Sequence, residues 1–293
     1  MFQNVLVGVD GSANGHDAVR LAATLADPLG KLTLAHVRTG KLHPLHAIAP
    51  GRLAEERQAS EQLLERELAL AEIDADLVSI VSMSPGRGLH EHAEDVNADL
   101  LVVGSCSHGA VGRVMLGDAT RAALNGAPCA VAVATRGYAD YPAPISRIGV
   151  GFNGSRESQA ALELARSLAA PRRATVEALE VVSIPSYGFA GAAMGADVDL
   201  MLAQASDRMK ELSGVEGRAV YGGAGEQLTL LSDEVDLLVV GSRSYGSVLR
   251  LVLGSTCDYL ERHARCSLLV LPRLAIDRTA DGEHDDETAN VAA

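Results

Sequence analysis

Short apolar runs alternate with longer amphipathic segments along most of the chain. Runs such as "VLVGV" and "LLVVG" have the length of strands buried on both faces, and each is followed by Asp or Ser. The segments between them carry apolar residues at helical spacing. This alternation predicts right-handed β-α-β units around a parallel sheet, and hence an α/β fold.

The sequence contains an internal repeat of this pattern. "DLLVVGSCSHGAVGRVMLG" from Asp99 and "DLLVVGSRSYGSVLRLVLG" from Asp236 share thirteen of nineteen positions, and "VGVDGS" near the start returns as "VGFNGS". The turn-rich joint "TRGYADYPAPIS" separates the copies. We therefore expect domains at 1–136 and 147–273, a linker at 137–146 and an acidic disordered tail at 274–293.

Each copy is expected to form a five-stranded, doubly wound, Rossmann-like parallel sheet with helices on both faces. In the first copy a helix should run from the N-cap Ser12 to near Gly30, and another over 53–72. The expected strands are 4–9, 32–37, 77–81, 100–104 and 129–134, then 147–152, 175–182, 217–221, 237–241 and 267–271.

Composition narrows the class of partner. The chain has 293 residues, 47% of them hydrophobic, and a formal net charge of -13, which argues against nucleic acid and anionic membranes as partners. Neither a membrane-spanning run nor a leader is visible, so a cytoplasmic protein is expected. The four cysteines lack paired spacing, which disfavours a zinc site and predicts reduced thiols.

In such sheets ligands bind beyond the carboxyl ends of the strands, where the winding reverses. Two loops per copy lie there: "VDGS" or "FNGS" after the first strand, and a glycine-rich stretch after the fourth. In the first copy this stretch spans Gly104 to Gly117 and leads into a helix whose free N–H groups favour an anion. Arg113 and Arg250 add positive charge. Phosphate fits this chemistry best; the alternative is that the glycines only make a tight turn.

The segments "VLVGVDGS", "LTLAHV", "DLLVVGS" and the glycine-rich stretch, in this order, resemble the universal stress protein family over nearly the whole chain. The resemblance implies ATP binding, with phosphates on the glycine loop and the nucleoside beside the first two strands. A Ser stands in both copies where the family loop has its second glycine. The implied contacts are Asp10, Val37, Gly104, Ser107, Gly109, Gly117 and Asp118 in the first copy, and Asn153, Val181, Gly241, Ser242, Ser244, Gly246, Arg250, Gly254, Ser255 and Thr256 in the second.

The copies differ at the end of the loop, where the first has Asp118 and the second Ser255. As a helix N-cap, Asp118 would occupy the free amides and repel a phosphate. Two like charges about 4 Å apart at an effective dielectric of 20 cost about 4 kcal/mol, or a roughly thousandfold loss of affinity. A magnesium ion between them would cancel this repulsion. We therefore expect the second copy to be the better ATP site, with magnesium as an optional companion.

The function favoured by these features is a nucleotide-binding, stress-response regulatory protein without an enzymatic role. The alternative is a nucleotide-free pseudo-dimeric scaffold for protein partners, and a third hypothesis is slow ATP hydrolysis or autophosphorylation. The resemblance also implies that the last strands, "CAVAVA" and "CSLLVL", pair edge to edge across the copies. A homodimer of the whole chain is compatible with each of these hypotheses.

Overall fold

A computed structural model of the chain describes residues 1–39, 50–105, 114, 117–142, 144–183, 193–242 and 254–271. At 50–52, 118–119 and 193–197 it describes the backbone alone. We call the part with strands β1 to β5 the first half and the part with β6 to β10 the second half. The first half contains β1 (Phe2–Gly8), α1 (Ala13–Leu25), β2 (Ala26–Thr39), α2 (Pro50–Ala71), β3 (Asp76–Ser82), α3 (Pro85–Asp95), β4 (Leu100–Gly104), α4 (Asp118–Leu124) and β5 (Ala130–Ala134).

The second half repeats this order of elements. It contains β6 (Arg147–Phe152), α5 (Arg156–Arg172), β7 (Thr175–Val182), α6 (Ala193–Lys210), β8 (Glu216–Tyr221), α7 (Ala224–Leu231), β9 (Leu237–Gly241), α8 (Ser255–His263) and β10 (Ser267–Leu271). The predicted α/β fold with a duplicated β-α-β order is confirmed.

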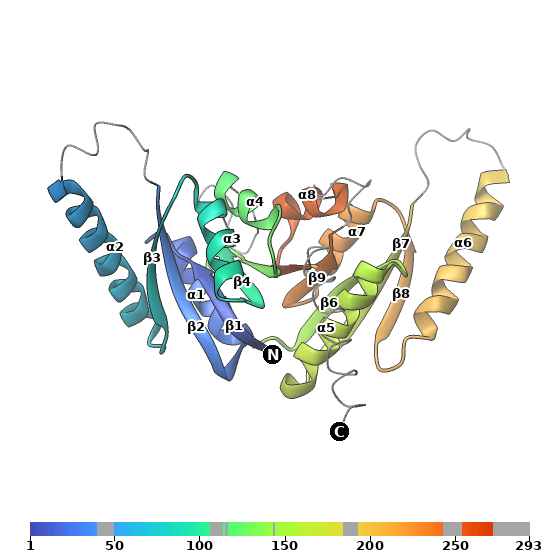
Figure 1. Cartoon of the computed structure of the whole chain (residues 1–293). Helices are drawn as coiled ribbons and strands as arrows, with labels where there is room; N and C mark the ends of the chain where they lie inside the picture. Colours follow the sequence, from blue (N-terminus) through green and yellow to red (C-terminus); the bar gives the residue numbers. More distant parts are fainter. Residues whose placement is uncertain are drawn as a thin grey trace, which may run out of the picture.

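All strands join one ten-stranded sheet in the order β3-β2-β1-β4-β5-β10-β9-β6-β7-β8. Within each half the strands are parallel, whereas β5 and β10 pair antiparallel at the centre, with Leu269 opposite Ala132. The expected pairing of the last strands is therefore confirmed, and the two halves form one continuous sheet (Figure 1).

Helices cover both faces of each half, as a doubly wound sheet requires. In the first half α1 and α2 pack on one face, and α3 and α4 on the other; α5 with α6 and α7 with α8 repeat this division. The alternation of side chains in β1 sends Val5 and Val7 into one apolar cluster and Leu6 into the other. Each cluster contains residues of both halves, so the core is continuous across the joint.

The first helix departs from the prediction at its end. Ser12 is its N-cap as expected, but α1 stops at Leu25 and β2 begins at once, so the predicted extension to Gly30 is wrong. Pro28 explains the stop, because a proline disfavours helical backbone at the residue before it and has no N–H to donate. The Asp27 carboxylate also accepts from the Leu29 amide at 2.9 Å and closes a turn there.

Buried polar contacts tie the segment after β5 to the first half. The Asp17 carboxylate on α1 accepts hydrogen bonds from the amides of Gly137 (2.8 Å) and Ala139 (2.7 Å). Burial raises the pKa of this carboxyl, although the two amide donors oppose the shift. Across the joint, the Arg172 guanidinium on α5 donates to the Thr24 carbonyl on α1.

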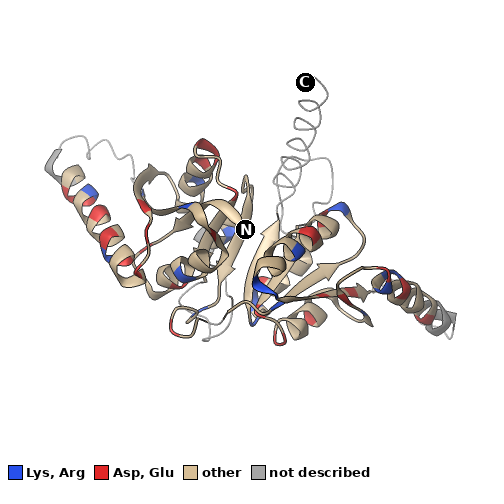
Figure 2. Ribbon diagram, turned by 90° about the horizontal axis from the view of Figure 1, so that it is seen from below, with Lys and Arg blue, Asp and Glu red and all other residues tan. Residues whose placement is uncertain are grey.

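Residues of both charges are mixed along the helices of the two halves. Figure 2 shows Lys and Arg interspersed with Asp and Glu along the two outermost helices. Within the described residues no helix is both long and apolar enough to cross a membrane.

Candidate functional site

Two equivalent cavities lie where β1 and β4, and β6 and β9, end. These strand pairs are neighbours in the sheet, and the helices that follow them cover opposite faces, so each cavity lies at a reversal of winding. The first-half cavity has a volume of about 340 Å³ and the second-half cavity about 330 Å³. Both volumes fall at the lower end of the range for small-molecule sites.

The turn after the first strand has the same backbone in both halves. Gly11 and Gly154 adopt φ of 77° and 75°, a conformation that favours glycine. The Asp10 carboxylate accepts from the Ser12 amide (3.0 Å) and the Ser12 hydroxyl (2.6 Å), all through Oδ1. Asn153 Oδ1 accepts from the Ser155 amide (3.0 Å). The same turn thus presents a carboxylate in one half and an amide in the other.

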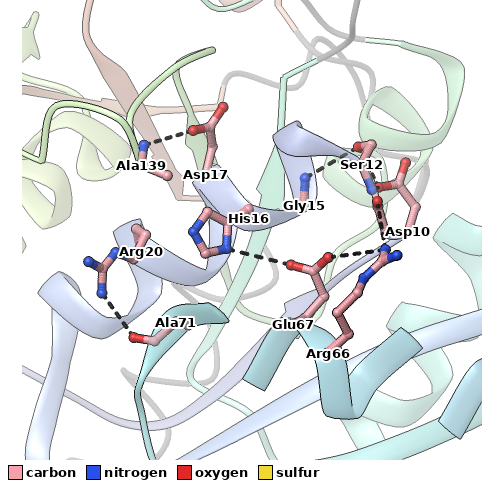
Figure 3. A network of polar contacts seen from close by, with 11 residues as sticks. Asp10, Ser12, Gly15, His16, Asp17, Arg20, Arg66, Glu67, Ala71 and Ala139 are labelled. Carbon is pink, nitrogen blue, oxygen red and sulfur yellow. Dashed lines mark hydrogen bonds and ion pairs between the residues drawn. The ribbon is translucent and has the colours of Figure 1, made fainter. Parts of the chain in front are cut away.

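Different side chains hold the two turns. In the first half Arg66 on α2 donates to the Gly11 carbonyl (3.2 Å). The next residue, Glu67, is buried, and its Oε2 lies 3.6 Å from Nδ1 of His16 on α1 (Figure 3). In the second half Gln159 on α5 donates to the Gly154 carbonyl (3.3 Å). The first turn is therefore fastened from outside by α2, whereas the second is fastened by its own helix.

Gly104 and Gly241, the first glycines of the two loops, are required by helix packing. A Cβ on Gly104 would lie 2.1 Å from the Asn14 carbonyl oxygen, and one on Gly241 would lie 2.7 Å from Glu157. Both contacts are with the first turn of the helix after the first strand. These glycines therefore allow that helix to approach the fourth strand, whether or not they contact a ligand.

The helices after the glycine loops begin at glycine. Gly117 is the N-cap of α4 and Gly254 the N-cap of α8, so Asp118 and Ser255 are the first helical residues. The expectation that Asp118 is the N-cap is therefore wrong. A glycine N-cap has no side chain to accept from the first N–H groups, which leaves them available to a ligand.

The two cavities differ in charge. The described lining of the second-half cavity contains amide, hydroxyl, thiol and apolar groups and no ionisable carboxylate or base. The first-half lining includes the Asp10 carboxylate and the imidazole-bearing His36. Burial raises the pKa of the Cys257 thiol in the second cavity to about 12, so this group is neutral at physiological pH. An anion meets less repulsion in the second half.

The second strand of each half, β2 in the first and β7 in the second, is held by different side-chain contacts beside its cavity. In the first half a chain of hydrogen bonds runs from His36 Nδ1 to Ser60 (2.8 Å), Ser79 (2.7 Å) and Arg38 Nε (2.9 Å). Burial lowers the pKa of His36, and Arg38 adds to the shift while Asp10 opposes it. In the second half Glu180 takes the place of His36 and pairs with Arg208 on α6.

Most predicted residues that the structure describes lie at the two cavities. Asp10, Val37, Gly104 and Gly117 line the first, and Asn153, Val181, Gly241, Gly254, Ser255 and Thr256 line the second. Ser242 is buried beside the second cavity without lining it, and its hydroxyl has no hydrogen-bond partner among the described residues. The side chain of Asp118, and the whole of Ser107, Gly109, Ser244, Gly246 and Arg250, lie outside the described residues.

Several lining residues were not predicted. Leu179 lies two positions before Val181 on the same face of β7, so strand alternation would have indicated it. Leu89 on α3 and Leu228 on α7 close the apolar side of each cavity. Nothing local in the sequence marks these two leucines, because their role depends on how a third helix packs. Among the described residues no group of three or more potential His, Cys, Asp or Glu metal ligands gathers.

Comparisons with known proteins agree on one family. The family model described as the universal stress protein family matches residues 1–135 and 144–272. A universal stress protein of Mycobacterium tuberculosis (strain CDC 1551 / Oshkosh) is 27% identical over 282 residues, which cover 93% of this chain and 97% of that protein.

Solved structures show the same architecture. A universal stress protein from Archaeoglobus fulgidus DSM 4304 superposes with a TM-score of 0.65 at 18% identity, covering 92% of this chain and 98% of that one. A putative universal stress protein from Pseudomonas aeruginosa UCBPP-PA14 gives 0.61 at 14% identity, covering 95% and 96%. At these identities the likeness shows the fold alone.

Proposed function

The chain belongs to the universal stress protein family, and from this premise we propose that it binds ATP in its second-half cavity and acts as a regulatory module of a stress response. The observation that carries the proposal is the uncharged cavity closed by the N-terminus of α8, where Gly254, Ser255 and Thr256 line the wall. The first N–H groups of a helix, together with the helix dipole, favour a phosphate at this point.

The remainder of the cavity suits a nucleoside. Apolar side chains from β7 and α7, Leu179, Val181 and Leu228, offer a surface for a base. Asn153 and Ser155 lie at the end of β6 and offer polar groups for a ribose. Apolar groups on one side, polar groups at the turn and free N–H groups at the helix match the three parts of a nucleotide. The adenine base is proposed from the resemblance of the sequence motifs.

Magnesium would enter with the nucleotide rather than on ligands of the protein. The described lining of the second cavity offers hydroxyl groups and no carboxylate, whereas magnesium in nucleotide sites is typically held by one or two carboxylates plus the phosphates. Ser255 and Thr256 are the residues whose hydroxyls fit such a metal–phosphate group.

The first half favours the alternative function, a nucleotide-free element of a pseudo-dimeric scaffold. Asp10 lines its cavity, and Asp118 opens α4 directly after the cavity-lining Gly117. Asp118 stands at the first position of α4, where the second half has Ser255 at the start of α8, and an added negative charge at this position opposes a polyphosphate. We therefore propose that the second half binds ATP and that the first half is the nucleotide-free part of the scaffold.

Titration calorimetry of the full chain with Mg-ATP tests the proposal. We expect about one ATP per chain and weaker binding of GTP. Ser255→Asp should lower the affinity by roughly a thousandfold, because it places a like charge about 4 Å from a phosphate. Ser84→Asp adds the same charge at the N-cap of α3, outside the second-half cavity, and should leave the affinity unchanged.

The reverse substitution completes the design. Asp118→Ser removes the carboxylate at the start of α4 and should raise the number of bound ATP molecules towards two per chain. Equal affinity in wild type and Ser255→Asp, or no ATP binding by the wild type, would contradict the proposed function.

A further inference from the structure

Helix α8 touches both candidate sites. Its first residues line the second-half cavity, and the carbonyl of Ala264 directly after its end accepts a hydrogen bond from the Val114 amide at 3.0 Å. Val114 belongs to the glycine-rich stretch of the first half, between β4 and α4. A helix of nine residues is about 13 Å long, so one short rigid element connects the two places.

The contact at Val114 is buried. The Val114 side chain is fully inaccessible and belongs to the same apolar cluster as Leu260 and Ala264 of the second half. A residue of the first-half loop therefore packs into the joint between the halves. Any displacement of the end of α8 has to move Val114 or break its hydrogen bond.

A second link joins α8 to α4. Arg121 on α4 donates to Asp258 (3.1 Å) and Glu261 (2.9 Å) on α8. Arg121 and Asp258 occupy equivalent positions in the two halves, each the fourth residue after the N-cap glycine. The same position thus carries opposite charges in the two copies, and these charges meet at the joint.

The buried carboxylate of Glu261 relies on Arg121 for its charge partner. The Glu261 side chain is only 2% exposed, and its Oε1 has no hydrogen-bond partner among the described residues. Burial raises the pKa of Glu261, and Arg121 opposes this shift. A carboxylate in this position depends on its cation, so removal of Arg121 would leave a buried charge without its partner and loosen the contact between α4 and α8.

The N-terminal turn of α4, next to Arg121, reaches the first-half cavity. Gly117 and Thr120 line that cavity, and the Thr120 hydroxyl donates to the Gly104 carbonyl at 3.0 Å. The path from the second cavity to the first therefore consists of α8, the Arg121 ion pairs and the Val114 hydrogen bond.

We propose that α8 transmits occupancy of the second-half cavity to Val114 and α4 of the first half, with Arg121 as the positioning residue. This inference rests on the proposed ATP binding. A phosphate at the N-terminus of α8 stabilises the helix and its position, and both links then restrain the first half. ATP in one half thus stabilises the buried Val114 contact of the other, which gives the scaffold a nucleotide-dependent state.

Amide hydrogen exchange of the full chain, with and without saturating Mg-ATP, tests this inference. In the wild type we expect ATP to slow exchange of the Val114 amide by about fivefold or more, the lower bound of typical allosteric coupling. In Arg121→Gln we expect ATP still to bind, while the slowing falls to within about twofold of none. Arg262→Gln is the matched control, because Arg262 pairs with Asp258 within α8 and should leave the slowing intact.

Glu261→Gln provides a second route should Arg121→Gln fail to fold. It removes the buried carboxylate that requires the cation, and should also reduce the slowing. Full slowing in a folded Arg121→Gln or Glu261→Gln variant overturns the inference, as does slowing that persists in Ser255→Asp, which would mean direct binding in the first half. ATP binding by the wild type without slowing at Val114 overturns the inference and leaves the proposed function standing; no ATP binding overturns both.

Discussion

The two cavities have nearly the same volume, and the turns after their first strands have the same backbone, yet two matched positions differ in charge. The first-half cavity has Asp10 at its turn and Asp118 next to its lining, where the second has Asn153 and Ser255. Both halves keep the left-handed glycine of the turn and the glycine N-cap of the following helix. Duplicated cavities can therefore keep the same backbone turn and glycine N-cap while acidic residues in one copy are replaced by neutral polar residues in the other.

The support of the cavities differs as well. In the first half, α2 holds the turn through Arg66 and holds β2 through the Ser60–His36 hydrogen bond. In the second half, Gln159 of α5 holds the turn, and the Glu180–Arg208 ion pair connects β7 to α6. The second cavity also has Leu179 where the first has Ala35. Equivalent cavities are thus built on different contacts, and substitutions at matched positions should separate them.

The largest expected effect on the free energy of unfolding concerns Gly104 and Gly241, the glycines that end β4 and β9. Gly104→Ala should lower the free energy of unfolding by about 3 kcal/mol, because the new methyl group meets the Asn14 backbone and the helix has to shift. Gly241→Ala should cost less, about 1–2 kcal/mol, since its methyl group is less crowded by Glu157. Urea unfolding measures both. Equal losses, or no loss, would contradict the tighter contact of Gly104 with its helix.

The course of the chain was predictable where apolar runs are bounded by turn residues. The strands Leu100–Gly104 and Leu237–Gly241 have the predicted bounds, because "LLVVG" has buried strand composition on both faces and stops at glycine. The end of α1 differs from the prediction because Pro28, and not Gly30, sets the position at which the helix stops. Gly30 instead packs against the backbone of Gln3 in β1, a contact between separate elements.

The candidate site was predictable at the ends of the strands but not where helices dock on the sheet. The reversal of winding indicated the turns that carry Asp10 and Asn153, whereas Val37 and Val181 were implied only by the resemblance to the family; all four line the cavities. The hydrogen-bonded chain from His36 to Arg38 and the leucines of α3 and α7 were not predicted. These side chains meet only after α2, α3 and α7 dock on the sheet, so no local motif encodes them.

The smallest expected effect is a pH dependence confined to the first half. Because the pKa of His36 is lowered by burial, the folded protein binds a proton there less readily than the unfolded chain does. The stabilising contribution of neutral His36 is present above about pH 6.5 and is lost as the pH falls below it. Urea unfolding between pH 5 and 8 should show a shallower acid-side loss in His36→Gln than in the wild type.

Glu180→Gln is the matched control for this experiment, because Glu180 occupies the equivalent position of the second half and pairs with Arg208. It should keep the wild-type loss of stability between pH 6.5 and 5. An unchanged profile in His36→Gln would mean that the hydrogen-bonded chain through Ser60 does not depend on a neutral imidazole.

Photolabelling of the wild-type chain with 8-azido-ATP and magnesium, followed by peptide mapping, tests whether ATP binds in the second half and not in the first. If it does, label appears on peptides of β7 and α7, around Leu179 and Leu228, and is lost when unlabelled ATP is added. Label concentrated around Val37 and Leu89 of the first half, and competed equally by ATP, would contradict it.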